Sequence, residues 1–598
     1  MSSPVYITGI GIISAIGNNQ REVLASLRSK QSGIGKMRYL ESEHKDLPVG
    51  EVKLSDEQMR EMLFLEKEQA ANRTSLMGTI AMREAIKDAH LPNLPQDVYL
   101  VSGTTVGGMD YTERCFLDLI KDDQNLSTLS THDCGATTSL QAQYFGIPEH
   151  RVITVSTACS SAANAIAVGA DLIKAGKTDL VIAGGSEAIT KFHLNGFNSL
   201  MILDHEVCRP FDASRTGLNL GEGAAYIILE SPDSIKKRGI TPIGEIRGYG
   251  NACDAYHQTA SSPNGDGAYL AMRKAIESSG LSTNSIQYVN AHGTGTPNND
   301  ASESVALRRI FGDEIPLVSS TKSFTGHTTS ASGAIETVIC LLAINNEFVP
   351  SNLGWNNQME DGITPTLGED HHKLDIVMCN SFGFGGNDTS LILSSFEGKL
   401  TPSPTPFLRP VYIRSQSCHQ PTDEDINFRE FISPMEARRM GKLQKVALAT
   451  SYKALRDADI ETPDGIFMGT RYGMLSNSEK FLRQMCEEGE HALGPTLFMQ
   501  STHNTIAGML AARLKCHGYN ITFSQGEHSL DCALQYAALS IALGNIDNAL
   551  VGCHDEYTPL FHDMLKRLTG KDIPSGEYST SIVLTSSPRN ALKEFTDF

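Results

Sequence analysis

The sequence lacks several patterns that mark common functional classes. No run of about 18 apolar residues occurs, so neither a membrane-spanning helix nor a membrane partner is expected. No basic leader precedes the first apolar stretch, "VYITGIGIISAIG", which we interpret as a buried strand and not as an export signal. These absences favour a cytoplasmic protein. Basic residues are also in the minority, with 50 Lys and Arg against 69 Asp and Glu, and the net charge of −19 argues against a protein that coats nucleic acid.

Patterns that bind metals or nucleotides are missing as well. The 12 cysteines form no CxxC pair and no HExxH segment occurs, so we expect no metal site. There is no GxxxxGK(S/T) loop to hold a nucleoside triphosphate. Because the cysteines are spread along a long chain without an export signal, we expect reduced thiols and not disulfides.

Two kinds of segment alternate through most of the chain. Short β-branched runs such as "VYLVSGTTVG" and "DLVIAGG" are separated by stretches with helical periodicity such as "TSLMGTIAMREAIKDA". This alternation predicts an α/β protein with buried sheets, and a length of 598 residues predicts several units of domain size. The proline-rich residues 398–408 predict a linker.

The chain also contains an internal repeat. "ITVSTACSS" at residues 153–161 returns as "ITFSQGEHS" at residues 521–529, an offset of 368. "EAIKDA" at residues 84–89 returns as "KALRDA" at residues 453–458, an offset of 369. An offset that stays nearly constant over about 180 residues indicates duplication, since chance similarity between α/β segments would not keep register so long.

Cys159 lies where an extended run changes to a helical pattern of small residues, in "STACSSAANAI". A lone cysteine is more often a small hydrophobe in a core than a nucleophile. The start of a helix favours the thiolate, however, and a tight turn there would direct the sulfur away from the sheet, as in nucleophile elbows. The cysteine alone leaves both interpretations open, and a nucleophile would need partners.

Candidate partners lie in two loops rich in small residues. His292 follows a strand-like run in "VNAHGTGTPNND", and His327 lies in "SSTKSFTGHTTSASGAIE", five residues after Lys322. Two histidines in such loops favour a role at a ligand over a purely structural role. Asp300 and Glu303 follow His292 at helix-start spacing, where an N-cap and a capping-box residue are the simplest interpretations.

Together these segments resemble one family, the β-ketoacyl-acyl carrier protein synthases, over residues 4–395. The motifs that carry the resemblance occur in the family's order: "VYITGIGIISAIGNN", "STACSSAANAI", "RPFDASRTGLNLGEGAAYIILE", "NAHGTGTPNND", "STKSFTGH" and "NSFGFGGND". The resemblance implies a thiolase-like fold, a layered αβαβα module made of two βαβαβαββ halves at residues 1–238 and 239–397. The repeat at residues 409–590 would be a third, unpaired and degenerate N-terminal half.

The resemblance also implies a decarboxylative Claisen condensation, in fatty acid or in polyketide and polyene synthesis. Cys159 would take an acyl chain from an acyl carrier protein, while His292 and His327 would bind the malonyl thioester and stabilise its enolate. The backbone N–H groups of Cys159 and Phe384 would form the oxyanion hole. The other implied residues are Lys322 and Glu303 as a buried pair, Thr294 and Thr296 in the malonyl pocket, and the Phe384 ring as a gate. No cofactor is implied beyond the phosphopantetheine of the carrier protein.

The repeat carries Glu527 where the first copy has Cys159, and no HGTGT, KSxTGH or GFGG motif follows it. It resembles chain-length factors, the partner subunits without the nucleophilic cysteine. Glu527 is interpreted as vestigial or structural, with a role in decarboxylation or in acyl length as the alternative. Because a lone half would leave an apolar helix layer in water, we expect it to dock on the synthase module or on its counterpart in a dimer. A non-catalytic partner of another condensing enzyme is the alternative function. Thiolase-type and chalcone-synthase-type enzymes are disfavoured by His327.

Further partners are implied by the resemblance. An acyl carrier protein is expected to dock, and because both proteins are acidic it would need a local basic patch, for which Lys67, Arg73 and Arg209 are candidates. A homodimer is also implied, with the segment "RVITV" at residues 151–155 pairing across its two-fold axis. A heteromer with another synthase subunit is the alternative.

Overall fold

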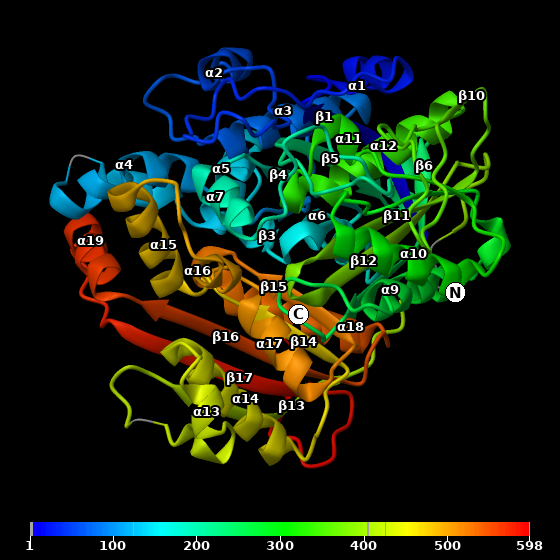
Figure 1. The fold of residues 1–598 in the computed structure, drawn as a ribbon. Coiled ribbons are helices and arrows are strands. Elements are labelled where there is room, and N and C mark those ends of the chain that lie inside the picture. The colour runs from blue at the N-terminus through cyan, green and yellow to red at the C-terminus, as the bar shows by residue number, and fades with distance from the viewer. Residues whose placement is uncertain (1–3, 124, 403–405, 425, 597–598) are drawn as a thin grey trace.

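The computed structural model describes residues 4–123, 125–402, 406–424 and 426–596, so part of the expected linker, residues 403–405, lies outside the described residues. The strands form one 16-stranded sheet in the order β18-β13-β17-β16-β14-β15-β3-β2-β4-β5-β1-β6-β12-β11-β7-β8, beside a separate hairpin of β9 and β10. Figure 1 shows three regions along this sheet, from green at the right to red at the lower left. The predicted α/β class is confirmed. Within the described residues, no helix is both long and apolar enough to cross a membrane.

The first region, which we call the first half, comprises residues 4–238. Its strands are β1 (Val5–Ser14), β2 (Tyr99–Gly103), β3 (Val152–Val155), β4 (Leu180–Glu187) and β5 (Gly223–Glu230). Its helices are α1 (Gln20–Arg28), α2 (Asp56–Leu63), α3 (Arg73–Asp88), α4 (Met109–Lys121), α5 (Cys134–Phe145), α6 (Ser161–Lys174), α7 (Lys191–Ser199) and α8 (Pro232–Arg238).

The second half comprises residues 239–397 and continues the sheet from β1. Its strands are β6 (Gly244–Cys253), β7 (Tyr288–Asn290), β8 (Leu317–Ser319), β9 (Phe348–Val349), β10 (Glu369–Asp370), β11 (Ile376–Gly383) and β12 (Asn387–Ser394). Its helices are α9 (Asp266–Ser279), α10 (Pro297–Phe311), α11 (Lys322–Thr325) and α12 (Ser332–Asn346).

Helices α6 and α12 form the centre of these two halves. Both are buried around most of their circumference, as their runs of alanine, valine, isoleucine and leucine require, and both belong to one hydrophobic core. The helices approach closely because Gly333 has no side chain, and a Cβ there would lie 2.8 Å from the Cβ of Ala163. The 3-10 turns that precede them, η3 (Ala158–Ser160) and η5 (Thr329–Ala331), also contact each other. Segments of the first and second halves therefore meet where the two helices begin.

The third half comprises residues 409–596. Its strands are β13 (Val411–His419), β14 (Gly465–Gly469), β15 (Tyr519–Phe523), β16 (Asn548–Tyr557), β17 (Gly576–Thr585) and β18 (Lys593–Phe595). Its helices are α13 (Pro434–Ala437), α14 (Lys442–Ala458), α15 (Leu475–Glu488), α16 (Pro495–Met499), α17 (Thr505–Leu514), α18 (Ser529–Ala542) and α19 (Pro559–Thr569). The strand order β13-β17-β16-β14-β15 repeats the order β1-β5-β4-β2-β3 of the first half, so the sequence repeat is also a repeat of topology.

The third half joins the first half edge to edge, through β15 and β3. Val155 and Phe523 lie opposite each other, and they are equivalent residues, 368 positions apart. On one side of this pair the N–H of Ser156 donates to the carbonyl oxygen of Thr522 at 2.8 Å, and on the other side the equivalent N–H donates back to the first half at 2.9 Å. These paired bonds define a local two-fold axis within one chain. The segment that we expected to pair between two copies pairs here with the chain's own third half.

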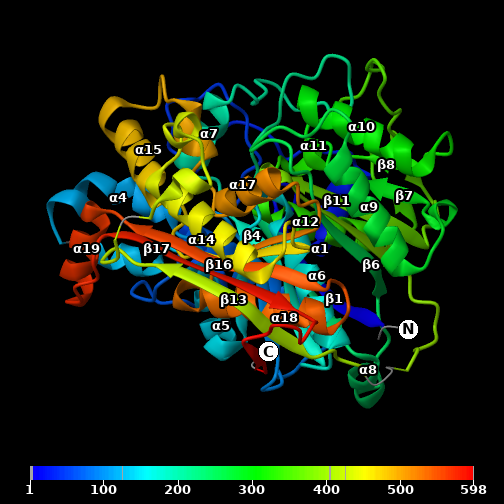
Figure 2. The same ribbon diagram turned by 90° about the horizontal axis from the view of Figure 1, so that it is seen from below.

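We expected the third half to dock because an apolar helix layer would otherwise face water. It docks on the first half, and the face that stays exposed along β13 is polar. Along β1 every residue is buried, whereas along β13 buried residues alternate with polar ones, of which Arg414 is half-buried and Gln416 and Cys418 are exposed. The register of β13 shifts between Ile413 and Ser415, so Val411 and Ile413 belong to the central core, whereas Ser415 faces α14 and its hydroxyl donates to the carbonyl oxygen of Ala454 at 2.6 Å (Figure 2). Beyond this shift the exposed Gln416 and Cys418 alternate with residues that face α14, as in sheets covered on one side only.

Candidate active site

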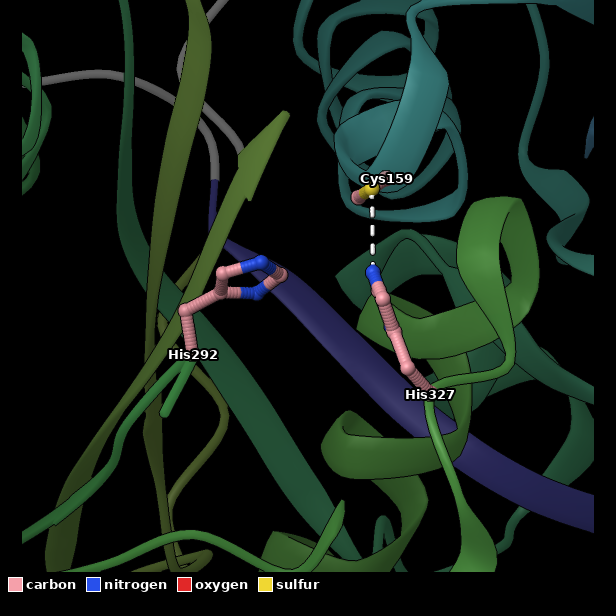
Figure 3. A group of neighbouring side chains, drawn as sticks. All are labelled: Cys159, His292 and His327. Carbon is pink, nitrogen blue, oxygen red and sulfur yellow. Dashed lines mark hydrogen bonds between the residues drawn. The ribbon is translucent and has the colours of Figure 1, made fainter. Parts of the chain in front are cut away.

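Cys159 lies in η3, in the turn between β3 and α6, as the sequence pattern predicted. The turn requires a left-handed residue, and Ala158 takes that role with φ of 52°. The N–H of Thr157 donates to the Ser161 hydroxyl at 2.9 Å, and that hydroxyl donates to the carbonyl oxygen of Ala158 at 2.6 Å. These bonds hold the turn, and the Cys159 side chain is directed to the interface with the second half (Figure 3).

Two histidines of the second half meet this cysteine. His292 follows β7, and His327 follows α11, so each lies in the loop where the sequence placed it. The Nε2 atom of His327 is 3.1 Å from the Sγ atom of Cys159, and the two imidazole rings meet edge to face at 5.3 Å (Figure 3). The sulfur and one nitrogen of each ring lie within 4.8 Å of one another, a spacing at which the three side chains could also hold a metal ion. All three residues are buried.

Burial favours the neutral form of all three side chains of this cluster. Burial raises the pKa of Cys159 to about 12, although the charge of Lys322 and the backbone N–H of Phe384 act in the opposite direction. Burial and the charge of Lys322 lower the pKa values of His292 and His327 well below their usual range. Burial therefore opposes the thiolate that the start of the helix was expected to favour, and α6 itself begins only at Ser161.

Lys322 is buried, but its partner is not the residue that the family resemblance implied. Its ammonium group forms an ion pair with Glu336, which lies on α12, and not with Glu303. The sequence carried a signal that was missed: Glu336 is the one carboxylate in the apolar helical run "SGAIETVICLLAINN". A carboxylate in a fully buried helix requires a partner, and the nearest cation in the sequence is Lys322.

Glu303 orients the loop of His292 instead. Its carboxylate accepts the N–H groups of His292 at 2.9 Å and of Gly293 at 2.8 Å, and burial raises its pKa to about 7. The capping-box interpretation of Glu303 is therefore wrong. The N-cap interpretation of Asp300 is also wrong, because Thr296 occupies the N-cap position of α10, without a side-chain capping bond, and Asp300 is buried inside the first turn.

Two cavities meet at Cys159. The front cavity is lined mostly by the second half, including His292, Thr294, Thr296 and Asn298, and partly by the first half. The rear cavity is lined by Met109, His132 and Phe192 of the first half and by Leu475, Phe498 and His503 of the third half. Sequence reasoning found none of the third-half residues, because they line the cavity only through the fold.

Phe384 lies between the cavities and lines both of them. Its ring stacks on Phe197 with 5.6 Å between centroids, and its backbone N–H is directed to the Cys159 sulfur. Thr294 and Thr296, expected in the malonyl pocket, line the front cavity with their hydroxyl oxygens 2.9 Å apart. The geometry therefore offers one nucleophile, two hydrogen-bonding imidazoles, and separate spaces for two substrates.

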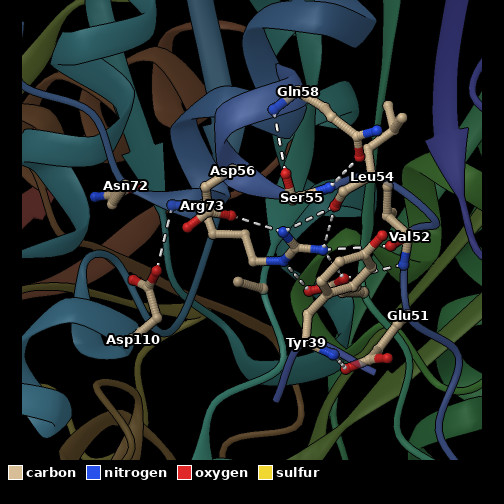
Figure 4. Close-up of polar contacts among 12 residues, drawn as sticks. Tyr39, Glu51, Val52, Leu54, Ser55, Asp56, Gln58, Asn72, Arg73 and Asp110 are labelled. Atoms are coloured by element: carbon tan, nitrogen blue, oxygen red, sulfur yellow. Dashed lines mark hydrogen bonds and ion pairs between the residues drawn. The ribbon is translucent and has the colours of Figure 1, made fainter. Parts of the chain in front are cut away.

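Arg73 is excluded from the expected carrier-protein docking patch. It is 4% exposed and forms ion pairs with Glu222 at 2.6 Å and Asp56 at 2.7 Å. Figure 4 shows its guanidinium group enclosed by these contacts, with further hydrogen bonds to the carbonyl oxygens of Val52 and Leu54. Its charge is used inside the fold, so it cannot meet an acidic partner.

The other two docking candidates differ from each other. Lys67 is exposed. Arg209 is half-buried and forms ion pairs with Asp204 at 3.2 Å and with Glu206, so much of its charge is neutralised by its own chain. Of the three candidates, Lys67 alone remains a free-standing surface cation in the described structure.

Comparison with protein-family models finds two matches. The description "Beta-ketoacyl synthase, N-terminal domain" matches residues 2–234 and again residues 411–569. The description "Beta-ketoacyl synthase, C-terminal domain" matches residues 243–356. The first and third halves therefore match the same model.

Curated relatives and solved structures cover different parts of the chain. Nodulation protein E of Rhizobium meliloti (strain 1021) is 33% identical over 65% of this chain and 99% of its own length. The 3-oxoacyl-[acyl-carrier-protein] synthase 1 of Haemophilus influenzae is 33% identical over 66% of this chain and 99% of its length. The ishigamide ketosynthase/chain length factor is 30% identical with a TM-score of 0.61, covering 66% of this chain and 100% of that one. The PfaC Keto synthase-Chain length factor, 15% identical, covers 98% of this chain and 78% of its own with a TM-score of 0.81, which shows a shared fold.

Proposed function

The chain belongs to the β-ketoacyl synthase family, and from that premise we propose that it condenses a Cys159-bound acyl chain with malonyl-carrier protein. The observation that carries this proposal is the Cys159–His292–His327 cluster at the junction of two cavities. The intact cluster also speaks against the alternative of a non-catalytic partner. The product would be a 3-oxoacyl chain two carbons longer, in fatty acid or polyketide synthesis.

The first step is transfer of the acyl group to Cys159. The sulfur attacks the thioester carbonyl, and the thiol proton passes to the leaving pantetheine sulfur as the old C–S bond breaks, while the Nε2–H of His327, 3.1 Å away, donates to the Cys159 sulfur. Because the pKa of the buried thiol is about 12, proton removal accompanies the attack and does not precede it. The backbone N–H groups of Cys159 and Phe384 would bind the developing oxyanion.

The second step uses the front cavity. The Nε2–H groups of His292 and His327 would donate to the carbonyl oxygen of the malonyl thioester while its carboxylate leaves as carbon dioxide. The electron pair of the broken bond forms an enolate, whose carbon attacks the Cys159 thioester and releases the sulfur. Neutral imidazoles suit this donation, and the low pKa values of both rings keep them neutral. Lys322 and Glu303 are positioning residues, the first paired to Glu336 and the second holding the His292 loop.

The third half would act as an internal partner. In solved structures of the family the second subunit is named a chain length factor, and here the third half closes the rear cavity in the same chain. Because β15 already occupies the edge of β3, a second copy is not needed at that edge. We therefore propose that one chain forms the working unit, with an acyl carrier protein as its transient partner and Lys67 as a surface cation for docking.

Acylation of Cys159 tests the proposal directly. Incubation with an acyl-carrier protein should raise the mass of the protein by one acyl group, located on the tryptic peptide that contains Cys159. Addition of malonyl-carrier protein should then release the group as the 3-oxoacyl product. Cys159→Ala should show neither result, and condensation by that variant would overturn the assignment.

A chelator distinguishes this function from a metal site at the same atoms. Thiol and imidazole groups are good ligands for zinc, so added Zn²⁺ should inhibit by occupying Cys159 and both histidines. Dialysis against a chelator should leave condensation unchanged, because the proposed steps use the free thiol. Loss of activity on chelation, restored by metal, would contradict the proposed steps.

A further inference from the structure

The rear cavity has polar groups where a cavity for a plain hydrocarbon chain would have apolar ones. Besides aromatic and aliphatic walls, it is lined by three histidines: His193, His503 and His132. Burial is the largest cause that lowers the pKa of His327, and the His193 ring is a further cause. Burial likewise lowers the pKa of His503, with His132 and His193 as further causes. His193 lies beside Phe197, which stacks on Phe384 next to Cys159. His503 belongs to the third half, with its Nε2 atom 3.9 Å from the Cys134 sulfur, and His132 is next to Asp133 at the seam between the two halves.

The three rings are neutral hydrogen-bonding groups. Burial lowers the pKa values of His132 and His193, and burial together with His132 lowers that of His503 to about 4. A neutral imidazole offers one N–H donor and one acceptor. The Nδ1 atom of His132 contacts the Thr112 hydroxyl at 2.8 Å, and within the described residues its Nε2 atom has no hydrogen-bond partner. The His193 ring likewise has no hydrogen-bond partner within the described residues, being surrounded by Phe192, Phe197 and Phe498.

The charged residue of this wall is already neutralised. Arg471 of the third half binds Asp133 of the first half with 3.0 Å between its Nε and Oδ2, and Asp133 is buried. A further nitrogen of Arg471 lies 3.7 Å from Glu527. The guanidinium group therefore joins the halves and does not offer a free cation. The wall suits an uncharged oxygen group and not a carboxylate.

We propose that the rear cavity selects an acyl chain that carries uncharged oxygen substituents, carbonyl or hydroxyl, remote from the thioester. His193, His503 and His132 would hydrogen-bond these oxygens, while Phe192, Phe197 and Phe498 contact the carbon chain. A saturated chain would remove water from these rings without replacing its hydrogen bonds, and each unmatched polar group lowers binding by about tenfold or more. The inference rests on the proposed function, because it assumes that Cys159 carries the chain.

Acylation of Cys159 by thioesters of N-acetylcysteamine tests the selectivity. Three chains of equal length are compared: a saturated chain, one with a terminal hydroxyl, and one with a carbonyl in the middle. We expect kcat/KM of the native protein for at least one oxygenated chain to exceed that for the saturated chain by about tenfold. The terminal hydroxyl tests the His503 and His132 end, and the mid-chain carbonyl tests His193.

Variants locate the selectivity. His132→Leu and His503→Leu should lower kcat/KM for the hydroxylated chain about tenfold and leave that for the saturated chain equal or higher, whereas His503→Gln should retain part of the preference. His491→Leu is the matched control, since it lies on the third half at the surface and should change neither value. If a leucine variant unfolds, the selectivity of the native protein and that of His503→Gln still test the proposal.

The outcomes separate this inference from the proposed function. Failure of every thioester to label Cys159 would overturn the function itself. Labelling by all three chains with equal or better rates for the saturated one would overturn only the selectivity. Equal losses for oxygenated and saturated chains in His503→Leu would also overturn it, because they would show a structural role for the ring.

Discussion

The turn that carries Cys159, the first elbow, and the turn that carries Glu527, the second elbow, share a backbone conformation but differ in chemistry. Elements η3 and α6 of the first half reappear as η8 (Gly526–His528) and α18 in the third half, each shifted by 368 residues. The left-handed turn residue is Ala158 in the first, with φ of 52°, and Gly526 in the second, with φ of 56°. In each turn a backbone N–H donates to the serine that starts the helix, to Ser161 at 2.9 Å and to Ser529 at 3.0 Å.

The side chains at the two turns have different surroundings. Cys159 is 5% exposed and lies against His327, whereas the side chain of Glu527 is 80% exposed with Arg471 at 3.7 Å. The difference comes from the second half, which supplies both imidazoles and Lys322 to the first elbow. A conserved turn is therefore a scaffold, and catalytic chemistry depends on a second set of segments packed against it.

We expect the largest effect when the residues at the two turns, Cys159 and Glu527, are exchanged. Cys159→Glu should lower condensation by about 10³-fold or more, because no other group can carry the acyl chain. Glu527→Cys should leave condensation unchanged, and its new thiol should stay unacylated by carrier-bound substrates because it has no imidazole partner. Steady-state rates and peptide mass spectrometry measure both results. An acylated residue 527 would show that the turn alone suffices.

Breaking the buried ion pair between Lys322 and Glu336 should have the next largest effect. Lys322→Met leaves Glu336 buried without a partner, and such breaks cost about 3–5 kcal/mol in the free energy of unfolding. The double variant Lys322→Met, Glu336→Leu should regain most of that stability. Its condensation rate should nevertheless stay below that of the native protein, because the Lys322 charge no longer lowers the pKa values of His292 and His327. Urea unfolding and activity assays give the two readouts.

A double variant as unstable as the single one would contradict the pairing. Glu303→Gln is the useful comparison, since its partners are the backbone N–H groups of His292 and Gly293, and a neutral amide keeps one acceptor oxygen. It should lower activity through the His292 loop with a smaller loss of stability.

Sequence reasoning predicted what is local in the chain. The turn at Cys159, the loops of His292 and His327, and the repeat with Glu527 each depend on contiguous residues, and the structure shows them where expected. The α/β alternation likewise gave the fold class, because strand and helix periodicities are local patterns.

Pairings between distant segments were not predictable in the same way. Lys322 had two carboxylates at plausible distances in sequence, and only the packing of α12 selects Glu336. Arg73 has an ordinary surface-like sequence context, yet the fold buries it against Glu222, 149 residues away. The rear cavity joins His132 to His503 across the seam between two halves, which no single motif encodes.

The exposed face of β13 is polar, whereas the corresponding face of β1 is apolar and covered, and this difference should keep the third half from self-associating. Gln416→Val with Cys418→Ile would give the exposed face of β13 the apolar pattern that Ile10 and Ile12 give β1. We expect this variant to self-associate, because an apolar sheet face without a partner is an interaction site. Sedimentation velocity would show the larger species. Gln416→Asn with Cys418→Ser is the matched control and should behave as the native protein. Unchanged sedimentation of the apolar variant would mean that this face is covered.

The smallest effect concerns a histidine of the third half that occupies the place of Ser186. His554 on β16 is 1% exposed, its Nδ1 contacts the Ser579 hydroxyl at 2.8 Å, and within the described residues its Nε2 has no partner. Burial lowers its pKa to about 3. Above an unfolded pKa of about 6.5 both states are neutral, so His554 carries no pH-dependent cost there.

As the pH falls below about 6.5, the unfolded chain binds a proton at His554 that the folded protein excludes until the pH approaches the folded pKa of about 3. The free energy of unfolding should therefore decrease by about 1.4 kcal/mol per pH unit from this residue, or about 2 kcal/mol at pH 5. His554→Asn, which keeps a hydrogen-bonding group, should flatten the slope between pH 7 and 5 by that amount, measured by urea unfolding at each pH. Parallel slopes for both proteins would show that the ring is protonated in the fold, and therefore that water or a rearranged side chain reaches its Nε2.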